Sequence, residues 1–274
     1  MNKPSAVTHV RVVAVRPDRH VELPERLATE EPLEIRVEGP GQHPEAVSVT
    51  MRTPGHDFEL AAGFLTSEGV AQQGAIRAVG YCDAVEDPAA RFNTVTVSLA
   101  HPFDTGAARR NFLSTSACGV CGTVSIDQLE VVCAPVGARP PVPAATISAL
   151  PERLRDGQRV FDQTGGLHAA GLFDAAGDLL VLREDVGRHN AVDKVIGHRV
   201  LSPGGAEPAV LMVSGRVGFE IVQKAAVAGI GVLAAVSAPS SLAVSAAARL
   251  GVCVAGFVRD DRFNIYSHPG RIAL

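Results

Sequence analysis

The amino-acid sequence predicts an α/β protein whose N-terminal portion is mostly β. In the second half of the 274-residue chain, apolar segments alternate with helical patterns, which is typical of a parallel sheet covered by helices on both faces. In the first half, short segments alternate apolar and polar residues with a period of two, as half-exposed strands do. Apolar residues make up 46% of the chain and charged residues 20%, which indicates a globular protein rather than a disordered one.

The first half contains three predicted strands and at least one predicted helix. The strands cover residues 32–38, 47–52 and 94–99, where apolar side chains recur at every second position. Residues 57–67 predict a helix, because apolar residues recur there at helical spacing: Phe58, Leu60, Ala61, Phe64 and Leu65.

The second half begins with a predicted helix over residues 150–161, although Gly157 weakens the pattern. Two strands, 168–173 and 178–182, flank the turn Ala175-Ala-Gly-Asp178 and predict a hairpin. Helices and strands then alternate to the end of the chain. They are a helix that includes residues 192–200, a strand at 209–213, a helix from Phe219, a strand at 232–236, a helix from Ser240 and a strand at 252–257.

These patterns divide the chain into four predicted segments. Prolines at positions 135, 140, 141 and 143 resist both a helix and a central strand, which indicates a linker. The predicted segments are an N-terminal tail (1–16), a strand-rich domain that carries a close cysteine pair (17–133), a Pro-rich linker (134–146) and an α/β domain that binds a cofactor (147–274).

Composition and charge argue against several classes of partner. A net charge of −4 disfavours nucleic-acid binding through a broadly basic surface. Residues 1–16 carry charges throughout and lack the apolar stretch of a secretory signal. Residues 225–248 are uncharged, but glycine, serine and proline interrupt them, so they predict a helix, a strand and a second helix rather than a membrane span. Five cysteines, an odd number, do not resemble a secreted disulfide framework. We expect a cytoplasmic protein that binds neither nucleic acid nor membrane.

The segment Cys118-Gly-Val-Cys121-Gly122 is the sharpest chemical signal. Two cysteines three positions apart can share a disulfide, a metal ion or a transferable sulfur. Gly119 and Gly122 permit positive φ angles, which suits a tight, exposed loop. Because the thiolate is the reactive form of cysteine, either residue must ionise and reach solvent to act as a nucleophile.

Other interpretations of this pair stay open. Two incidental cysteines in a structural loop would give the same string. A structural zinc site normally needs four ligands, and Cys82, Cys133 and Cys253 are isolated in the sequence. Thioredoxin-like redox chemistry needs a strand-to-helix turn in a small βαβ unit, which the surrounding pattern lacks. A zinc-dependent deaminase needs His-x-Glu and Pro-Cys-x-x-Cys on successive helices, whereas the His-x-Glu strings lie far upstream and Ala117 replaces the proline.

Polar residues concentrate where the predicted strands of the second half end, which is where open α/β sheets bind ligands. Gly187 and Gly215 allow close backbone approach, and the helix N-termini that follow offer N–H groups to an anion. Four arginines there can pair with phosphate oxygens: Arg188, Arg216, Arg259 and Arg262. We therefore expect a pocket for a phosphorylated ligand, such as one that carries a nucleotide. The polar turns cover residues 164–168, 183–190, 214–220, 237–241 and 257–262.

Two common phosphate-binding motifs are missing from the sequence. Neither Gly-x-x-x-x-Gly-Lys-Ser/Thr nor a helix-opening Gly-x-Gly-x-x-Gly occurs, which disfavours ordinary ATP hydrolysis and nicotinamide binding. His168 and His189 are candidates for proton transfer, although a structural role is the more common one for a single histidine.

Together these segments resemble the FdhD family of accessory sulfurtransferases for formate dehydrogenase. The resemblance runs from about Pro32 to His268, and the motifs in this order are more specific than any one alone. The motifs are Thr53-Pro-Gly55, Glu59-Leu60, Gly63-Phe-Leu65, Cys118-Gly-Val-Cys-Gly122, Thr164-Gly-Gly166, His168-Ala-Ala170, Glu184-Asp-Val-Gly-Arg-His-Asn-Ala191, Ser214-Gly-Arg216 and Phe219-Glu220.

The resemblance implies a cytidine deaminase-like C-terminal domain without zinc chemistry, and a homodimer. It implies that sulfur passes from a cysteine desulfurase to the molybdenum bis(molybdopterin guanine dinucleotide) cofactor. That cofactor is the acceptor, which then enters the catalytic subunit of formate dehydrogenase, and the chain holds no metal of its own. The alternative is a non-enzymatic chaperone that binds the molybdenum cofactor or apo-formate dehydrogenase.

By the same resemblance, Cys118 carries the persulfide and Cys121 assists or resolves it, while residues 257–262 match the nucleotide-contacting segment of the family. Two positions depart from the family pattern. Gly218 stands where we expect serine, and Asp260-Asp261 places negative charge where phosphates or guanine would lie. The candidate cofactor-binding residues are Thr164, His168, Arg188, His189, Ser214, Arg216, Phe257, Val258, Arg259, Asp260, Asp261 and Arg262.

Overall fold

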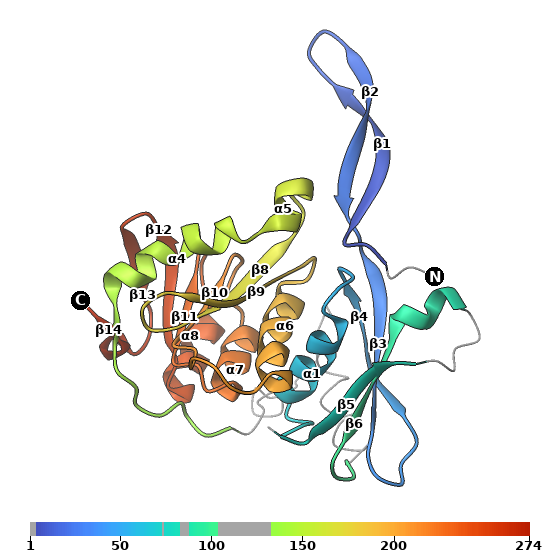
Figure 1. Cartoon of the computed structure of the whole chain (residues 1–274). Coiled ribbons are helices and arrows are strands. Elements are labelled where there is room, and N and C mark those ends of the chain that lie inside the picture. Colours follow the sequence, from blue (N-terminus) through green and yellow to red (C-terminus); the bar gives the residue numbers. More distant parts are fainter. Residues whose placement is uncertain (1–3, 73, 83–87, 104–132) are drawn as a thin grey trace.

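The computed structural model describes residues 4–72, 74–82, 88–103 and 133–274 (Figure 1). They form a strand-rich N-terminal portion and a C-terminal α/β portion, so the predicted fold class is confirmed. None of the helices within these ranges is both long enough and apolar enough to cross a membrane.

The N-terminal portion is built on a four-stranded sheet in the order β4-β3-β6-β5. Every second side chain of β3 points inward, and Leu33, Ile35 and Val37 are fully buried against helix α1. The predicted strands and helix of this half are therefore confirmed, while β5 is an addition. The elements are β3 (Glu31–Glu38), β4 (Glu45–Arg52), α1 (Asp57–Ser67), β5 (Ile76–Tyr81), the 3-10 helix η1 (Pro88–Asn93) and β6 (Thr94–Leu99).

The first residues of the chain do not form the expected tail. Strand β1 (Val7–Val15) pairs antiparallel with β2 (His20–Ala28) over its whole length, and the hairpin stands out from the rest of the molecule (Figure 1). Five of the nine residues of β1 are valines, which favours a strand even though no core lies beneath it. Residues 7–15 are therefore a strand rather than part of a tail. The other segment boundaries stay a prediction.

The C-terminal portion contains a six-stranded sheet in the order β13-β12-β11-β10-β8-β9. Strands β10, β11 and β12 are parallel, whereas the hairpins β8–β9 and β12–β13 add antiparallel neighbours at both edges. The sheet is thus mixed: the predicted hairpin of β8 and β9 lies at one edge of the parallel strands, and β13, which the sequence analysis did not predict, lies at the other. Its strands are β8 (His168–Phe173), β9 (Leu179–Asp185), β10 (Val210–Val213), β11 (Val232–Ala235), β12 (Cys253–Arg259) and β13 (Arg262–Ile265).

Helices cover both faces of this sheet (Figure 1). Helices α6 (Arg188–Leu201), α7 (Phe219–Val227) and α8 (Ser241–Leu250) pack on one face, around Leu211 and Leu233. Helix α4 (Ala144–Asp156) packs on the other face, around Met212 and Ala234. The uncharged stretch 225–248 is the end of α7, strand β11 and most of α8, as the sequence predicts.

The expected helix over residues 150–161 is two helices. Helix α4 ends at Asp156 with Gly157 as its C-cap, and α5 (Arg159–Thr164) follows after a break. A Cβ at Gly157 would lie 2.7 Å from Leu182 Cδ1, so the small residue lets the chain pass close to β9. The end of the expected linker pairs as β7 (Val142–Pro143) with β14 (Ile272–Ala273), just after the 3-10 helix η2 (Pro269–Arg271).

The two portions meet where α1 crosses α6 at very short range. A Cβ on Gly63 would lie 1.8 Å from the Asp193 carbonyl oxygen, and a Cβ on Gly197 would lie 1.8 Å from the Glu59 carbonyl oxygen. Only glycine fits at either position, so the two helix backbones touch directly. Close beside this crossing, the buried ammonium of Lys224 donates to Asp193 at 2.9 Å and to Glu68 at 3.0 Å.

Candidate anion site at the strand ends

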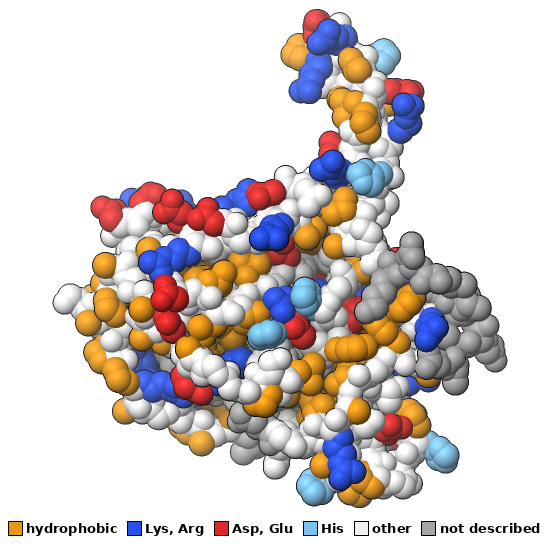
Figure 2. Space-filling view, viewed as in Figure 1, with side chains coloured by type: hydrophobic (Ala, Val, Ile, Leu, Met, Phe, Trp, Pro, Cys, Tyr) orange, Lys and Arg blue, Asp and Glu red, His pale blue; other side chains and the backbone are white. Residues whose placement is uncertain are grey.

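The expected polar turns do meet at one edge of the C-terminal sheet. Strands β10, β11 and β12 are parallel, and β9 runs in the same direction because β8 is antiparallel to both β9 and β10. The carboxyl ends of these four strands, and the start of β8, therefore lie along one edge. Figure 2 shows charged and histidine side chains gathered over α6 on the face in view.

Hydrogen bonds join these turns into one row. The Ser214 N–H donates to the Ala169 carbonyl at 3.0 Å, and the Val217 N–H donates to the Ala238 carbonyl at 3.1 Å. The Phe257 N–H then donates to the Ser237 carbonyl at 3.2 Å. We call this continuous set of turns, from His168 and Arg188 at one end to residue 257 at the other, the strand-end row.

Two polar atoms of the strand-end row lack partners. Among the described residues, Arg188 Nε and His189 Nε2 are buried atoms without a hydrogen-bond acceptor or donor. The Glu220 carboxylate lies 3.8 Å from His189 Nε2, which is beyond hydrogen-bond range. Buried polar atoms in proteins are almost always paired, so an unpaired guanidinium nitrogen at the first residue of α6 marks a place for an acceptor. An anion would supply one.

The histidines of the row favour their neutral forms. Burial, followed by the positive charge of Arg188, lowers the pKa of His189 to about 4. The same two causes lower the pKa of His168. Both rings are therefore neutral near pH 7, where each has one nitrogen that donates and one that accepts.

Glycine lets the backbone after β10 approach the two charged ends of the row. A Cβ on Gly215 would lie 3.3 Å from His168 Nδ1 and 3.8 Å from the Arg188 Cβ. The Ser214 hydroxyl accepts the Ala169 N–H at 2.9 Å and so fixes the turn against β8. The structure thus brings His168, Arg188 and Ser214 together, as the sequence predicts.

Other candidate residues lie at the margin of the row. Arg216 is exposed at the turn after β10. Gly218 caps α7 without a side-chain hydrogen bond, and a Cβ there would lie 2.9 Å from Glu220 Oε2, so a serine would have to displace that carboxylate. Thr164 ends α5, and its hydroxyl donates to the Val160 carbonyl at 2.9 Å. This hydrogen bond gives Thr164 a structural role at the end of α5.

Residues 257–262 form a hairpin rather than the expected loop after a strand. Strand β12 continues to Arg259, and Asp260-Asp261 is the two-residue turn that leads into β13. Phe257 and Asp260 have φ angles of 53° and 48°, the first at a bulge in the β12–β13 register and the second in the turn. The strand is longer than expected because Val258 is fully buried and extends the apolar pattern.

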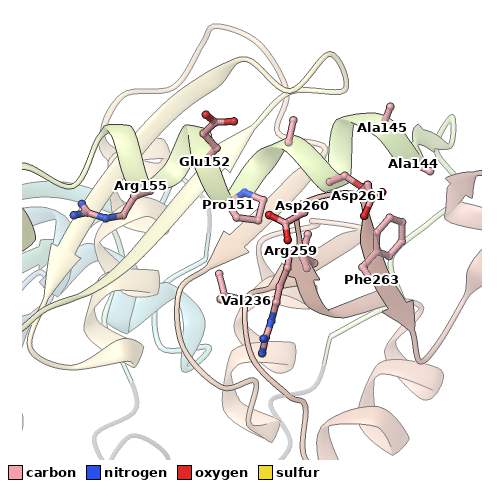
Figure 3. Close-up of a pocket in the computed structure, with 13 residues that line it drawn as sticks. Ala144, Ala145, Pro151, Glu152, Arg155, Val236, Arg259, Asp260, Asp261 and Phe263 are labelled. Carbon is pink, nitrogen blue, oxygen red and sulfur yellow. The ribbon is translucent and has the colours of Figure 1, made fainter.

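This hairpin and α4 enclose an open pocket of about 960 Å³ (Figure 3). Asp260 and Asp261 lie on the side of the pocket that faces α4, whereas the Arg259 side chain extends away from that helix. The lining holds the carboxylates of Glu152, Asp260 and Asp261 and the guanidinium groups of Arg155 and Arg259. Such a surface suits the N–H donors of a guanine edge better than a phosphate.

A buried network that the sequence analysis missed holds the start of α6. The Asp185 carboxylate accepts the Gly187 N–H at 2.8 Å, the Asn190 amide at 3.0 Å and the Thr53 N–H at 3.1 Å. It also pairs with Lys194 at 2.7 Å. Both carboxylate oxygens of Asp185 thus accept two hydrogen bonds each. Asp185 therefore fixes the start of α6 and, with it, the positions of Arg188 and His189. The signal in the sequence is only the pair of motifs at 53–55 and 184–191.

Cys118 and Cys121 lie outside the described residues. Of the remaining cysteines, Cys253 is fully buried in β12, and burial raises the pKa of its thiol to about 11. That thiol is therefore protonated at neutral pH and is a poor nucleophile.

The sequence profile of the FdhD/NarQ family matches residues 28–273. The chain belongs to the FdhD/NarQ family. The resemblance drawn from its motifs is thereby confirmed.

Relatives match over nearly their whole length. The sulfur carrier protein FdhD of Mycolicibacterium paratuberculosis is 50% identical over 273 residues, which cover 96% of this chain and 97% of that protein. The sulfur carrier protein FdhD of Streptomyces coelicolor is 46% identical and covers 96% of this chain and 95% of its own. The crystal structure of a candidate formate dehydrogenase accessory protein from Desulfotalea psychrophila is 26% identical, with a TM-score of 0.74, over 98% of this chain and 100% of that one.

Proposed function

We propose that this protein is a cytoplasmic sulfurtransferase that sulfurates the molybdenum bis(molybdopterin guanine dinucleotide) cofactor of formate dehydrogenase. The observation that carries the proposal is family membership over residues 28–273, a range that includes the Cys118-Gly-Val-Cys121 motif. Relatives about half identical to this chain are named as sulfur carriers. The unpaired Arg188 Nε atom of the strand-end row also supports the proposal, because a phosphate of such a cofactor would supply its missing acceptor.

The first step is a thiol exchange. The Cys118 thiolate attacks the terminal sulfur of a persulfide on a cysteine desulfurase, which forms Cys118–S–SH and releases the desulfurase thiolate. One S–S bond breaks and one forms, so no outside oxidant or reductant takes part. Gly119 and Gly122 give this segment the backbone freedom to serve two partners.

The second step delivers the sulfur. The Cys121 thiolate attacks the Cys118 Sγ atom, a disulfide forms, and hydrosulfide leaves for the molybdenum atom of the substrate. A thiol reductant then restores both cysteines. In this proposal Arg188 and Arg216 hold phosphates of the guanine dinucleotide at the strand-end row, and Asp260 or Asp261 accepts hydrogen bonds from a guanine. The loaded cofactor passes to the catalytic subunit of formate dehydrogenase, and the protein acts as a homodimer.

Mass spectrometry tests the first step directly. The protein is incubated with a cysteine desulfurase and isotopically labelled cysteine, and the peptide that contains Cys118 is then weighed. We expect a gain of one labelled sulfur atom, which Cys118→Ser removes and Cys82→Ser leaves unchanged. An unlabelled Cys118 peptide from an active desulfurase reaction would refute the sulfur carrier role.

A chaperone that only holds the cofactor or the apo-enzyme is the alternative. It predicts that formate dehydrogenase activity in cells survives Cys118→Ser. We expect that variant to fold normally and to abolish the activity, because no persulfide can form. Full activity with Cys118→Ser would favour the chaperone.

A further inference from the structure

Thr53 directs its N–H, its hydroxyl and its carbonyl group at the C-terminal portion of the molecule. It belongs to the N-terminal portion, in the turn between β4 and α1, and is 2% exposed. Its N–H donates to the Asp185 carboxylate at 3.1 Å, and its hydroxyl oxygen accepts the Val186 N–H at 3.2 Å. Its carbonyl oxygen accepts a hydrogen bond from the Lys194 ammonium at 2.9 Å. One residue of the N-terminal portion therefore binds the other portion at three places.

The turn that carries Thr53 is held in place within its own portion. The buried guanidinium of Arg52 donates to both carboxylate oxygens of Asp57, at 3.0 Å and 3.3 Å, and so joins the two ends of the turn. Asp57 also accepts the Gly55 N–H at 3.3 Å. Pro54 favours an extended backbone at the residue before it, which is Thr53. Thr53 therefore presents its hydroxyl oxygen from a fixed place.

The segment that Thr53 binds leads directly into the unpaired end of the strand-end row. Val186 lies in the turn between β9 and α6, two positions before Arg188 and three before His189. Its N–H is bound by the Thr53 hydroxyl, while the next N–H, that of Gly187, is bound by a carboxylate of the C-terminal portion at 2.8 Å. These two hydrogen bonds fix the path of the backbone into α6. They thereby set the direction in which the first side chains of the helix point.

We propose that Thr53 is a positioning residue for the anion site, because its hydroxyl oxygen holds the Val186 N–H and thereby aims Arg188 and His189 at their ligand. The inference rests on the proposed function, in which Arg188 holds a phosphate. Without this hydroxyl, the Val186 N–H loses its acceptor and the turn shifts towards another one. Affinity for an anion then falls, because Arg188 is no longer held in the binding position before the ligand arrives.

Three substitutions at Thr53 in the full-length protein separate the hydroxyl from the rest of the side chain. Thr53→Val keeps the branched shape without the hydroxyl, and Thr53→Ala removes the hydroxyl without a new methyl group to pack. We expect both variants to bind guanosine diphosphate about 5-fold to 10-fold more weakly than the wild type in calorimetry, as the loss of one hydrogen bond would. Thr53→Ser keeps the hydroxyl and should stay within about twofold of the wild-type affinity. Wild-type affinity in the valine and alanine variants would overturn the proposal.

Thr66→Val is the matched control for the loss of a buried hydroxyl. The Thr66 side chain is also buried, but its hydroxyl donates to the Ala62 carbonyl at 2.9 Å within its own helix, α1. We therefore expect Thr66→Val to change the affinity for guanosine diphosphate by less than about twofold. Equal losses of affinity in Thr66→Val and Thr53→Val would contradict a specific role for Thr53, because a general loosening of the N-terminal portion would then explain both.

A pH titration of the His189 ring by NMR tests the positioning without any ligand, and His189→Gln assigns the ring signal. The charged or titratable groups that face this ring are the same in all the Thr53 variants: His168, Arg188, Glu220 and Lys224. We expect the pKa of His189 to be about 4 in the wild type and in Thr53→Ser, and to rise towards the ordinary value of about 6.5 in Thr53→Val as the turn shifts and the ring gains water.

The two measurements separate the failure of this inference from the failure of the proposed function. An unchanged His189 pKa in Thr53→Val and Thr53→Ala would refute the positioning role, even if the wild type binds guanosine diphosphate. A wild type that binds no guanosine diphosphate would refute the phosphate site of the proposed function, and the titration would then decide the role of Thr53 by itself.

Discussion

Buried polar groups are paired in the middle of helix α6 but not at its start. In the middle of the helix, Asp193 and Lys194 are fully paired, with Lys224 and Asp185 respectively. At its start, Arg188 Nε and His189 Nε2 are buried without partners among the described residues. Paired groups hold the two portions of the molecule together. Unpaired groups in the same helix cost stability, and a ligand that pairs them would recover it.

The paired groups in the middle of α6 give the largest predicted effect on stability. Lys224→Met leaves the buried carboxylates of Glu68 and Asp193 without their cation. We expect a loss of about 3–5 kcal/mol in the free energy of unfolding, measured with urea. The matched change Arg199→Met breaks an exposed pair with Glu207 and should cost about 1 kcal/mol at most. Equal losses in the two variants would mean that the buried triad does not join the portions.

The backbone contact beside this triad predicts a smaller loss. Gly63→Ala places a methyl group against the Asp193 carbonyl, so α1 must move away from α6. We expect a cost of about 1–3 kcal/mol in thermal or urea unfolding. A Cβ on Gly80 meets no atom within 4 Å, so Gly80→Ala should change stability by less than about 0.5 kcal/mol. A neutral Gly63→Ala would contradict the close crossing.

The sequence predicts the helix in this crossing but not the contact itself. Helix α1 has the bounds 57–67 that its apolar spacing predicts, because Leu60 and Leu65 repeat with the period of a helix. The triad joins Glu68 to Lys224 across 156 positions, and no local pattern reports such a pairing. The sequence analysis also missed the hairpin of β1 and β2, because the apolar residues of this hairpin are not part of a core.

The strand-end row is predictable for a different reason. Parallel strands place their carboxyl ends at one edge, so local turns become neighbours without any knowledge of long-range contacts. Ser214, Arg188 and His168 meet as predicted. Residues 257–262 do not behave as predicted, because β12 continues to Arg259 and turns back as a hairpin.

His189, at the start of α6, predicts a pH dependence of the free energy of unfolding. The unfolded chain protonates His189 near pH 6.5, whereas the folded chain, with a pKa of about 4, resists protonation. This group therefore removes stability as pH falls from about 6.5 to 4, and Asp193, whose pKa is raised to about 6, acts in the opposite direction.

Comparison with His189→Gln isolates the histidine from Asp193. As pH falls from about 6.5 to 4, we expect the free energy of unfolding of the variant to fall by about 1 kcal/mol less than that of the wild type. The difference is modest because 36% of the His189 side chain is exposed. Urea unfolding at several pH values gives the measurement. Parallel pH profiles for the two proteins would show that the histidine is not held neutral by the fold.

The smallest predicted change in stability belongs to Arg188. Its Nε atom has no acceptor to lose, so Arg188→Gln should alter the free energy of unfolding by less than about 0.5 kcal/mol. Guanosine diphosphate should nevertheless bind about 10-fold to 100-fold more weakly, and the difference should shrink at high salt. Arg77→Gln, at an exposed position of β5, removes the same charge and should leave the affinity unchanged. Calorimetry measures both affinities.

A structure of this protein with bound guanosine diphosphate tests the strand-end row most directly. We predict that a phosphate oxygen lies within hydrogen-bond distance of Arg188 Nε, at the start of α6, and that His189 Nε2 gains a partner. A nucleotide bound elsewhere, with both of these atoms still unpaired, would contradict the account.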